Sequence, residues 1–252
     1  MRQILLVVTL LHGPCIWATE AITPEQPPLT ACAFLESPWA YSDESGALAG
    51  IAVDLHAYFQ RATGRVIRTE PCTVKWAGTR LKEGSVDLAL LPEAEGLSQW
   101  AEPLIPAYRA RAMALPRKGV PVQRYEDLHG LTIAAPEGVD FNPRLQADPR
   151  VHMLWVASAA DALELLVGGR ADAVVGNANF YRFAASREGL DPNELFGPPF
   201  QLGERIVWVY ISRKTDAPQF AAKLQAAFSE VSLENMIRQL RDHYYQRAIS
   251  RH

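Results

Sequence analysis

The side chains that most often carry chemistry are spread thinly along the 252 residues of the chain. His56, His129, His152 and His243 stand alone in the sequence, so surface or core positions suit them better than metal ligation. The chain has no Gly-x-Ser-x-Gly turn, no His-Glu-x-x-His pair and no glycine-rich phosphate loop. These absences argue against the hydrolase, zinc-protease and P-loop classes, and we expect no metal and no cofactor.

Two cysteines, Cys32 and Cys72, form a pair with a different kind of chemistry. Cys32 falls in a predicted strand at 29–34, and Cys72 follows a predicted strand at 66–69. In a doubly wound sheet these strands are neighbours, so a disulfide is plausible in an oxidising compartment. A bridge and two buried thiols both remain open at this point.

The elements that must position these residues are organised around a short pattern that occurs twice, at 81–91 and 165–176. Each copy has the end of a helix, a glycine suited to a positive φ, and an apolar run of strand length. An aspartate, Asp87 or Asp172, stands at the start of each run. The two copies are too far apart for a solenoid repeat, and they predict two α/β lobes with largely parallel strands.

The first residues resemble a secretory signal. Arg2 is followed by an apolar run at 4–11, by Gly13-Pro14, and by Ala18 at a plausible cleavage point. A proline-rich stretch at 23–28 follows. We therefore expect export, with residues 1–18 as the signal peptide and a periplasmic mature protein.

Composition excludes several further classes. With 48% hydrophobic and 21% charged residues the chain can bury a core, and a net charge of −3 predicts no nucleic-acid partner. No segment after the N-terminus is long and apolar enough to cross a bilayer. We expect a monomer.

The remaining pattern predicts an alternation of strands and helices. We expect further strands at 108–115, 131–135, 151–156 and 206–211, and helices at 50–63, 158–167 and, as one amphipathic tail, 218–248. An irregular stretch is expected at 92–106. Asn142 and Pro143 form a helix start, with Asn142 as the cap and Pro143 in the first helical position.

Several ordered motifs resemble the family 3 extracellular solute-binding proteins, which supply amino-acid ABC transporters. The similar segments span nearly the whole mature chain: Ser37-Pro38-Trp39-Ala40-Tyr41, Gly50-Ile51-Ala52-Val53-Asp54-Leu55, Trp100-Ala101-Glu102-Pro103, Asp127-Leu128-His129-Gly130 and Gly169-Arg170-Ala171-Asp172-Ala173-Val174. The resemblance implies the type II periplasmic-binding-protein fold, an α/β fold with two lobes, two crossover strands and an interlobe ligand cleft. Lobe 1 would comprise 19–107 and 206–252, and lobe 2 would comprise 108–205.

The ligand-binding positions depart from this family. The loop that usually carries the arginine for an α-carboxylate here contains Glu93 and Glu95. Asp140 stands where a serine or threonine usually lies, and Asn177 where an aspartate meets the α-amino group. Glu36 and Ala52 also replace family residues. An ordinary amino-acid ligand is therefore not expected.

The resemblance leaves a set of residues that would line the cleft: Glu36, Trp39, Tyr41, Glu93, Gly138, Val139, Asp140 and Asn177. Aromatic rings with carboxylates suit a cationic or polar uncharged ligand. Because Asn142 and Pro143 already begin the next helix, Asp140 is free to face the cleft. We expect a cationic or hydrogen-bond-donating group of the ligand at Asp140, with Trp39 stacked on it.

Three functions fit this sequence. The first is a solute-binding protein, not an enzyme, that serves an ABC permease or a membrane sensor. The second is a periplasmic enzyme on the same scaffold, similar to cyclohexadienyl dehydratase, with Glu36, Glu93 or Asp140 as a general acid. The third is an accessory protein that binds no ligand and acts as an interaction module.

Overall fold

The computed structural model describes residues 26–137 and 142–249. The predicted signal peptide at 1–18 and the predicted site residues Gly138, Val139 and Asp140 lie outside these ranges. The strands are β1 (Leu29–Phe34), β2 (Tyr41–Ser42), β3 (Leu48–Ala49), β4 (Ile67–Cys72), β5 (Leu88–Pro92), β6 (Ala101–Pro116), β7 (Thr132–Pro136), β8 (His152–Val156), β9 (Ala173–Gly176) and β10 (Phe200–Ser212). The helices are α1 (Ile51–Thr63), α2 (Val74–Glu83), α3 (Pro143–Ala147), α4 (Ala159–Val167), α5 (Ala178–Arg187), α6 (Pro192–Leu195), α7 (Pro218–Ala227) and α8 (Glu230–Ile249), with short 3-10 turns at Leu97–Gln99 and Tyr125–Leu128.

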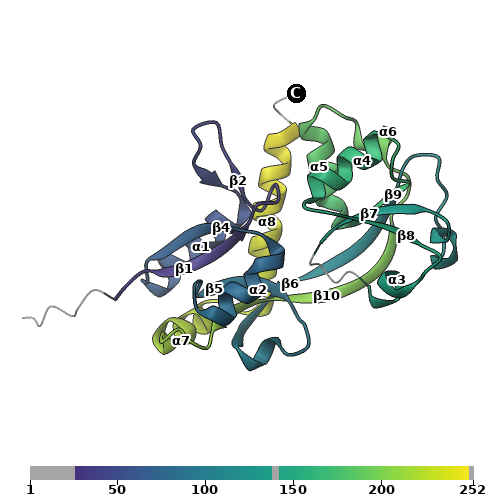
Figure 1. Cartoon of the computed structure of the whole chain (residues 1–252). Coiled ribbons are helices and arrows are strands. Elements are labelled where there is room, and N and C mark those ends of the chain that lie inside the picture. The colour runs from purple at the N-terminus through teal and green to yellow at the C-terminus, as the bar shows by residue number, and fades with distance from the viewer. Residues whose placement is uncertain (1–25, 138–141, 250–252) are drawn as a thin grey trace, which may run out of the picture.

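Eight strands form one continuous sheet in the order β4-β1-β5-β10-β6-β9-β7-β8 (Figure 1). Strands β1, β4 and β5 with α1, α2 and α7 form lobe 1, and β7 to β9 with α3 to α6 form lobe 2. Within each lobe the strands are parallel, and helices cover both faces. The fold is therefore the predicted type II periplasmic-binding-protein fold.

Two long antiparallel strands, β6 and β10, connect the lobes (Figure 1). Strand β10 pairs with β5 of lobe 1 at one end, and β6 pairs with β9 of lobe 2 at the other. Between these ends, residues 109–112 and 203–206 pair with each other. We call this central segment the hinge ladder. The prediction of an irregular stretch at 92–106 was wrong for residues 101–106. These residues belong to β6, which begins at Ala101 and pairs with β10 there.

The two aspartates of the repeated pattern accept equivalent hydrogen bonds from neighbouring strands in the two lobes. Asp87 accepts hydrogen bonds from the backbone N–H of Thr30 at 2.6 Å and from the hydroxyls of Thr30 and Thr215. Asp172 accepts one from the backbone N–H of Thr132 at 2.9 Å. Each carboxylate thus fixes the first residues of a neighbouring parallel strand, β1 or β7. The repeat therefore joins neighbouring strands in both lobes.

The C-terminal tail differs from the single helix that the sequence predicts. Helix α7 ends at Ala227 and α8 begins at Glu230, because Phe228 is extended and its ring packs on Phe59 in the lobe 1 core. The 20-residue α8 stands between the two lobes (Figure 1). It packs on α1 of lobe 1, on β6, and also on α5 of lobe 2. Among the described residues, no helix has the length and apolar character that a membrane span requires.

The disulfide joins Cys32 to Cys72 across the adjacent parallel strands β1 and β4. The two Cα atoms are 5.5 Å apart, and both residues are buried beneath α2. The bridge encloses the end of β1, then β2, β3, α1 and nearly all of β4, a sequence separation of 40 residues. It therefore ties the edge of lobe 1 to the strand that leads into the Glu36 loop.

Reduction of this bridge is expected to lower stability markedly. For a loop of this length the chain-entropy argument gives about 4 kcal/mol. Thermal unfolding with and without a reductant measures the effect, and the Cys32→Ser/Cys72→Ser protein should melt at the reduced temperature in both conditions. Equal melting temperatures for the oxidised and reduced wild-type protein would contradict this prediction.

Candidate functional site

An aromatic cluster fills the space where the two lobes meet beside the hinge ladder. Its members come from the loop after β1, from β6, from α5 and from α8. We call it the interlobe junction, and it comprises Glu36, Ser37, Trp39, Tyr41, Tyr108, Phe180, Tyr181, Phe183, Arg187, Tyr244 and Tyr245.

Trp39 lies at the centre of this junction and is only 7% exposed. Its ring stacks on Tyr108 of β6, with centroids 5.3 Å apart, and meets the edge of Phe180 from α5 at 6.3 Å. Residues from lobe 1, the crossover strand and lobe 2 therefore share one apolar contact. The sequence hypothesis placed the Trp39 ring against the ligand, whereas in the structure this ring packs against Tyr108 and Phe180.

Arg187 of lobe 2 contacts Tyr41 and Ser37 of lobe 1. The Arg187 guanidinium lies 5.4 Å from the centre of the Tyr41 ring and donates a 3.3 Å hydrogen bond to the Ser37 hydroxyl. This contact joins the end of α5 to the loop after β1. Cation–π contacts of this kind contribute about 0.5–1 kcal/mol at exposed sites, so Arg187 favours closure of the two lobes on this side.

Adjacent tyrosines of α8 contact opposite lobes. Tyr244 donates a 2.8 Å hydrogen bond to Asp54 of α1 and meets the Tyr41 ring edge-on. Tyr245 packs edge-on against Phe183 of α5, with centroids 5.2 Å apart. The C-terminal helix is therefore part of the junction, a role that its sequence pattern did not predict.

Glu36 is the acidic group of the junction. It is partly buried, and its carboxyl has no hydrogen bond or ion pair to any residue in the described part of the chain. Burial raises its pKa to about 7. Burial also raises the pKa values of Tyr108, Tyr181 and Tyr245, and a negative charge on Glu36 adds to each increase. Glu36 therefore lies within electrostatic range of tyrosines on β6, α5 and α8, and a cation or a hydrogen-bond donor would stabilise its ionised form.

Glu93 lies in a different part of the cleft, beside the hinge ladder. It is exposed and lines an open pocket of about 430 Å³ with Ala94, Glu95, Glu204, Arg205 and Ile206. Its backbone N–H donates to Ile206, and its carbonyl accepts from Arg205 at 3.4 Å. On the neighbouring strand Arg109 and Arg111 pair with Glu204. The carboxylates of this pocket thus stand among guanidinium groups, which makes it a mixed-charge surface.

Asn177 is placed at the N-terminus of α5, where its side-chain oxygen accepts the backbone N–H of Asn179 at 3.0 Å. That oxygen serves as a helix cap, which leaves the amide nitrogen for other contacts. Asn142 caps α3 as predicted, because it accepts the N–H of Leu145 and Pro143 follows it. Its amide also donates to the Leu202 carbonyl at 2.6 Å, so the chain just after residues 138–141 is tied to β10.

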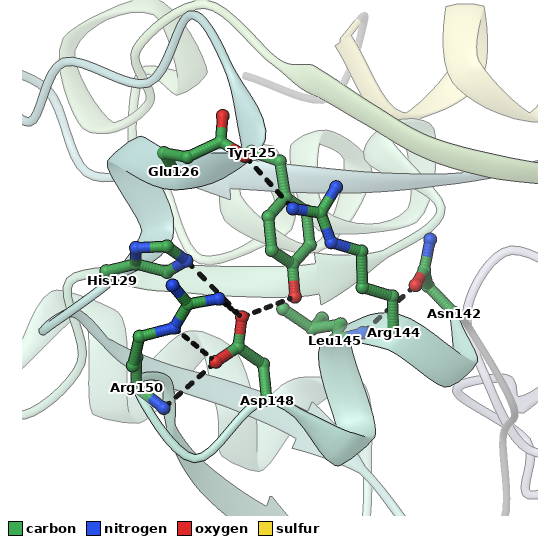
Figure 2. A network of polar contacts seen from close by, with 8 residues as sticks. All are labelled: Tyr125, Glu126, His129, Asn142, Arg144, Leu145, Asp148 and Arg150. Atoms are coloured by element: carbon green, nitrogen blue, oxygen red, sulfur yellow. Dashed lines mark hydrogen bonds and ion pairs between the residues drawn. The ribbon is translucent and has the colours of Figure 1, made fainter.

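A polar network anchors α3 from its other end (Figure 2). Asp148, whose side chain is 5% exposed, accepts two hydrogen bonds from the Arg150 guanidinium at 2.9 Å and one from the Tyr125 hydroxyl. His129 Nε2 lies 3.3 Å from the same carboxylate. The hydrogen bond from Arg150 holds the pKa of Asp148 well below its usual range. Arg144 of α3 stacks over the Tyr125 ring and pairs with Glu126. The network thereby fixes the helix that borders the lobe 2 side of the cleft.

The structure therefore divides the predicted site. Glu36, Trp39 and Tyr41 gather in the interlobe junction, Glu93 lies at the hinge pocket, Asn177 caps α5, and three residues fall outside the described ranges. Sequence reasoning missed Tyr108, Phe180, Tyr181, Arg187 and Tyr245. The density of aromatic residues in 178–187 and the Tyr244-Tyr245 pair were signals, but nothing in the sequence placed those segments beside Trp39.

Comparisons with known proteins support the fold. No protein-family model matches the chain, and no curated protein matches it. Solved structures do: the P235GK mutant of ArgBP from T. maritima has a TM-score of 0.67 at 19% identity, covering 89% of this chain and 93% of that chain. The BvgS periplasmic VFT2 domain of Bordetella pertussis has a TM-score of 0.68 at 18% identity, covering 84% and 92%.

A third similar structure is described as a histidine kinase sensor domain with similarity to periplasmic binding proteins. Its TM-score is 0.68 at 16% identity, and the match covers 90% of this chain and 96% of that chain. At these identities the likeness establishes the fold alone. The chain thus has the architecture of periplasmic binding proteins and of Venus flytrap sensor domains.

The raised pKa of Glu36 predicts a pH-dependent stability. The folded state holds the Glu36 proton more tightly than the unfolded state does, so stability is lost as the pH rises from about 4.5 through about 7. Glu36→Gln should therefore melt like the wild type at low pH and above it at pH 8. The gain is at most on the order of 3 kcal/mol, since one pKa unit corresponds to about 1.4 kcal/mol. Thermal unfolding across pH measures it, with exposed Glu95→Gln as the control; a pH-independent difference would argue against a buried Glu36.

The Arg187 contact predicts a change in lobe closure. Arg187→Ala should shift the unliganded protein a few-fold toward an open form, given a contact of about 0.5–1 kcal/mol. Distances between spin labels placed on the two lobes report the change. Arg182→Ala is the matched control, because Arg182 lies on the same helix but bonds Asn193 within lobe 2. Identical distance distributions for the two variants would show that Arg187 does not hold the lobes together.

Proposed function

We propose that the protein is an exported solute-binding protein that captures a small polar solute between its two lobes. The observation that carries this proposal is Glu36, a carboxyl without a described partner, enclosed where rings from both lobes converge. A carboxyl so placed favours a cationic or hydrogen-bond-donating group, because leaving it ionised and unpaired is costly. Closure of the lobes over the solute presents the closed form to a membrane partner, either an ABC permease or a sensor.

The comparisons are compatible with both kinds of partner. ArgBP from T. maritima has been described in an arginine-bound form, and another similar structure is described as a histidine kinase sensor domain. The absence of an arginine from the loop at 90–96 still argues against ordinary capture of an amino-acid carboxylate. We therefore propose a solute whose recognised group is basic or uncharged, and a periplasmic location for the exported chain.

One observation favours a second function, an enzyme on this scaffold. A carboxyl with a pKa of about 7 has the acidity that a general acid needs near neutral pH. The substrates of dehydratases of the cyclohexadienyl type are dicarboxylic acids, and the ring-lined surroundings of Glu36 do not favour an anion. We therefore rank this function below solute binding.

Native protein purified from the periplasm tests the proposal. Denaturation should release a small basic or polar compound that mass spectrometry identifies. Adding this compound to the refolded protein should raise the melting temperature, and the compound should not be consumed. Turnover of the compound would favour the enzyme. A purified protein that yields no compound, and that no member of a broad metabolite panel stabilises, would leave the interaction module as the remaining function.

A further inference from the structure

Two polar groups in the interlobe junction lack partners. The hydroxyl oxygen of Tyr245 is buried and has no hydrogen-bond partner among residues 26–137 and 142–249. The Glu36 carboxyl has no hydrogen bond or ion pair to the part of the chain that the structure describes. Buried polar groups are nearly always hydrogen-bonded, and leaving one unpaired costs about 1–3 kcal/mol. A buried hydroxyl of this kind and a partly buried carboxyl in one cluster mark a place where a partner from outside the chain belongs.

The neighbouring side chains do not supply that partner. Tyr245 turns its ring toward Phe183, and Trp39 is held between Tyr108 and Phe180. The hydroxyl of Tyr181 already donates to the Val175 carbonyl at 3.0 Å. The cation of the junction, Arg187, contacts Ser37 and Tyr41. The aromatic rings of the junction are thus in contact with one another.

Three elements bring the two groups to the same junction. The backbone carbonyl of Glu36 accepts a hydrogen bond from the N–H of Trp39 at 2.7 Å. This bond fixes the backbone of Glu36 one turn before Trp39. Tyr245 reaches the junction from α8, which Tyr244 anchors to Asp54 in lobe 1. The charge on Glu36 acts on Tyr245 as well as on Tyr108 and Tyr181. Ser37, next to Glu36, accepts a hydrogen bond from Arg187 of α5, and Tyr245 contacts Phe183 one turn earlier on the same helix. Glu36 and Tyr245 therefore lie against the same stretch of α5.

We propose, building on the solute-binding function above, that Glu36 and Tyr245 together hold an organic cation with N–H bonds, an ammonium or a guanidinium. One N–H of this cation donates to the Glu36 carboxylate and another donates to the Tyr245 hydroxyl oxygen. The surrounding rings attract its positive charge through their π faces. Tyr245 is accordingly a ligand-binding residue supplied by the C-terminal helix. A quaternary ammonium lacks the N–H donors, and a neutral amide lacks the charge.

Four probes of matched chain length separate these requirements: n-butylammonium, n-butylguanidinium, n-butyltrimethylammonium and butyramide. Calorimetry or thermal shift at millimolar concentrations should detect binding of at least one of the first two, and their ratio distinguishes ammonium from guanidinium. The trimethylated cation and the amide should bind clearly more weakly. Equal binding of n-butyltrimethylammonium would overturn the proposal, because charge alone would then suffice.

Two variants test the residues. Glu36→Gln should weaken binding of the N–H cation roughly 10- to 100-fold, and Tyr245→Phe, which keeps the ring, roughly 2- to 10-fold. Tyr58→Phe is the matched control, because Tyr58 is exposed on α1 and lies outside the junction, and it should leave the affinity unchanged. Melting curves confirm that each variant is folded.

The outcomes separate this inference from the proposed function. If the solute released from native protein binds with the same affinity to the wild type, Glu36→Gln and Tyr245→Phe, the inference is overturned while solute binding stands. The same holds if an ordered water alone occupies the space between the two groups in the solute complex. If no solute binds at all, the proposed function itself fails.

Discussion

The antiparallel pairing of β6 with β10 is the constraint on which the rest of the molecule depends. These strands belong to the sheets of both lobes at once, and only the hinge ladder at 109–112 and 203–206 lies free between them. Because the ladder is two strands wide, it fixes the distance between the lobes but permits bending. The interlobe junction forms beside this ladder, around Tyr108.

The junction differs from a permanent domain core in its composition. It combines stacked rings with a partly buried carboxyl, an unpaired phenol and a cation at the rim. Aromatic contacts favour closure, whereas the unpaired polar groups oppose it. A solute that forms hydrogen bonds with Glu36 and Tyr245 removes the unfavourable contribution of these polar groups to closure. Closure would then be coupled to binding through the free energy of these two groups, without a separate switch.

Local sequence signals predicted the elements of this fold well. The strand at 29–34 and the Asn142-Pro143 helix start appear in the structure as predicted, and the helix predicted from residue 50 begins at Ile51. Each depends on a few neighbouring residues. The start of β6 at Ala101 depends instead on β10, a hundred residues away, and the break at Phe228 depends on a ring in α1.

The candidate site was predictable only in part, for the same reason. The loop from Glu36 to Tyr41 carries recognisable residues close together, so sequence reasoning found it. Tyr245 and Arg187 reach it from α8 and α5, and their roles depend on how two lobes meet. The burial of Trp39 is likewise set by Tyr108 and Phe180 and by no property of its own segment.

The central claim is that the interlobe junction holds Glu36 in surroundings that favour a cationic or hydrogen-bond-donating solute. The most direct measurement is the pKa of Glu36 itself, from the carboxyl carbon resonance followed by NMR as the pH is changed. The structure predicts a midpoint of about 7 in the solute-free protein and a lower one when an N–H cation is bound. A midpoint near 4.5 that does not respond to solute would show that Glu36 is an ordinary surface carboxylate, and would contradict the account.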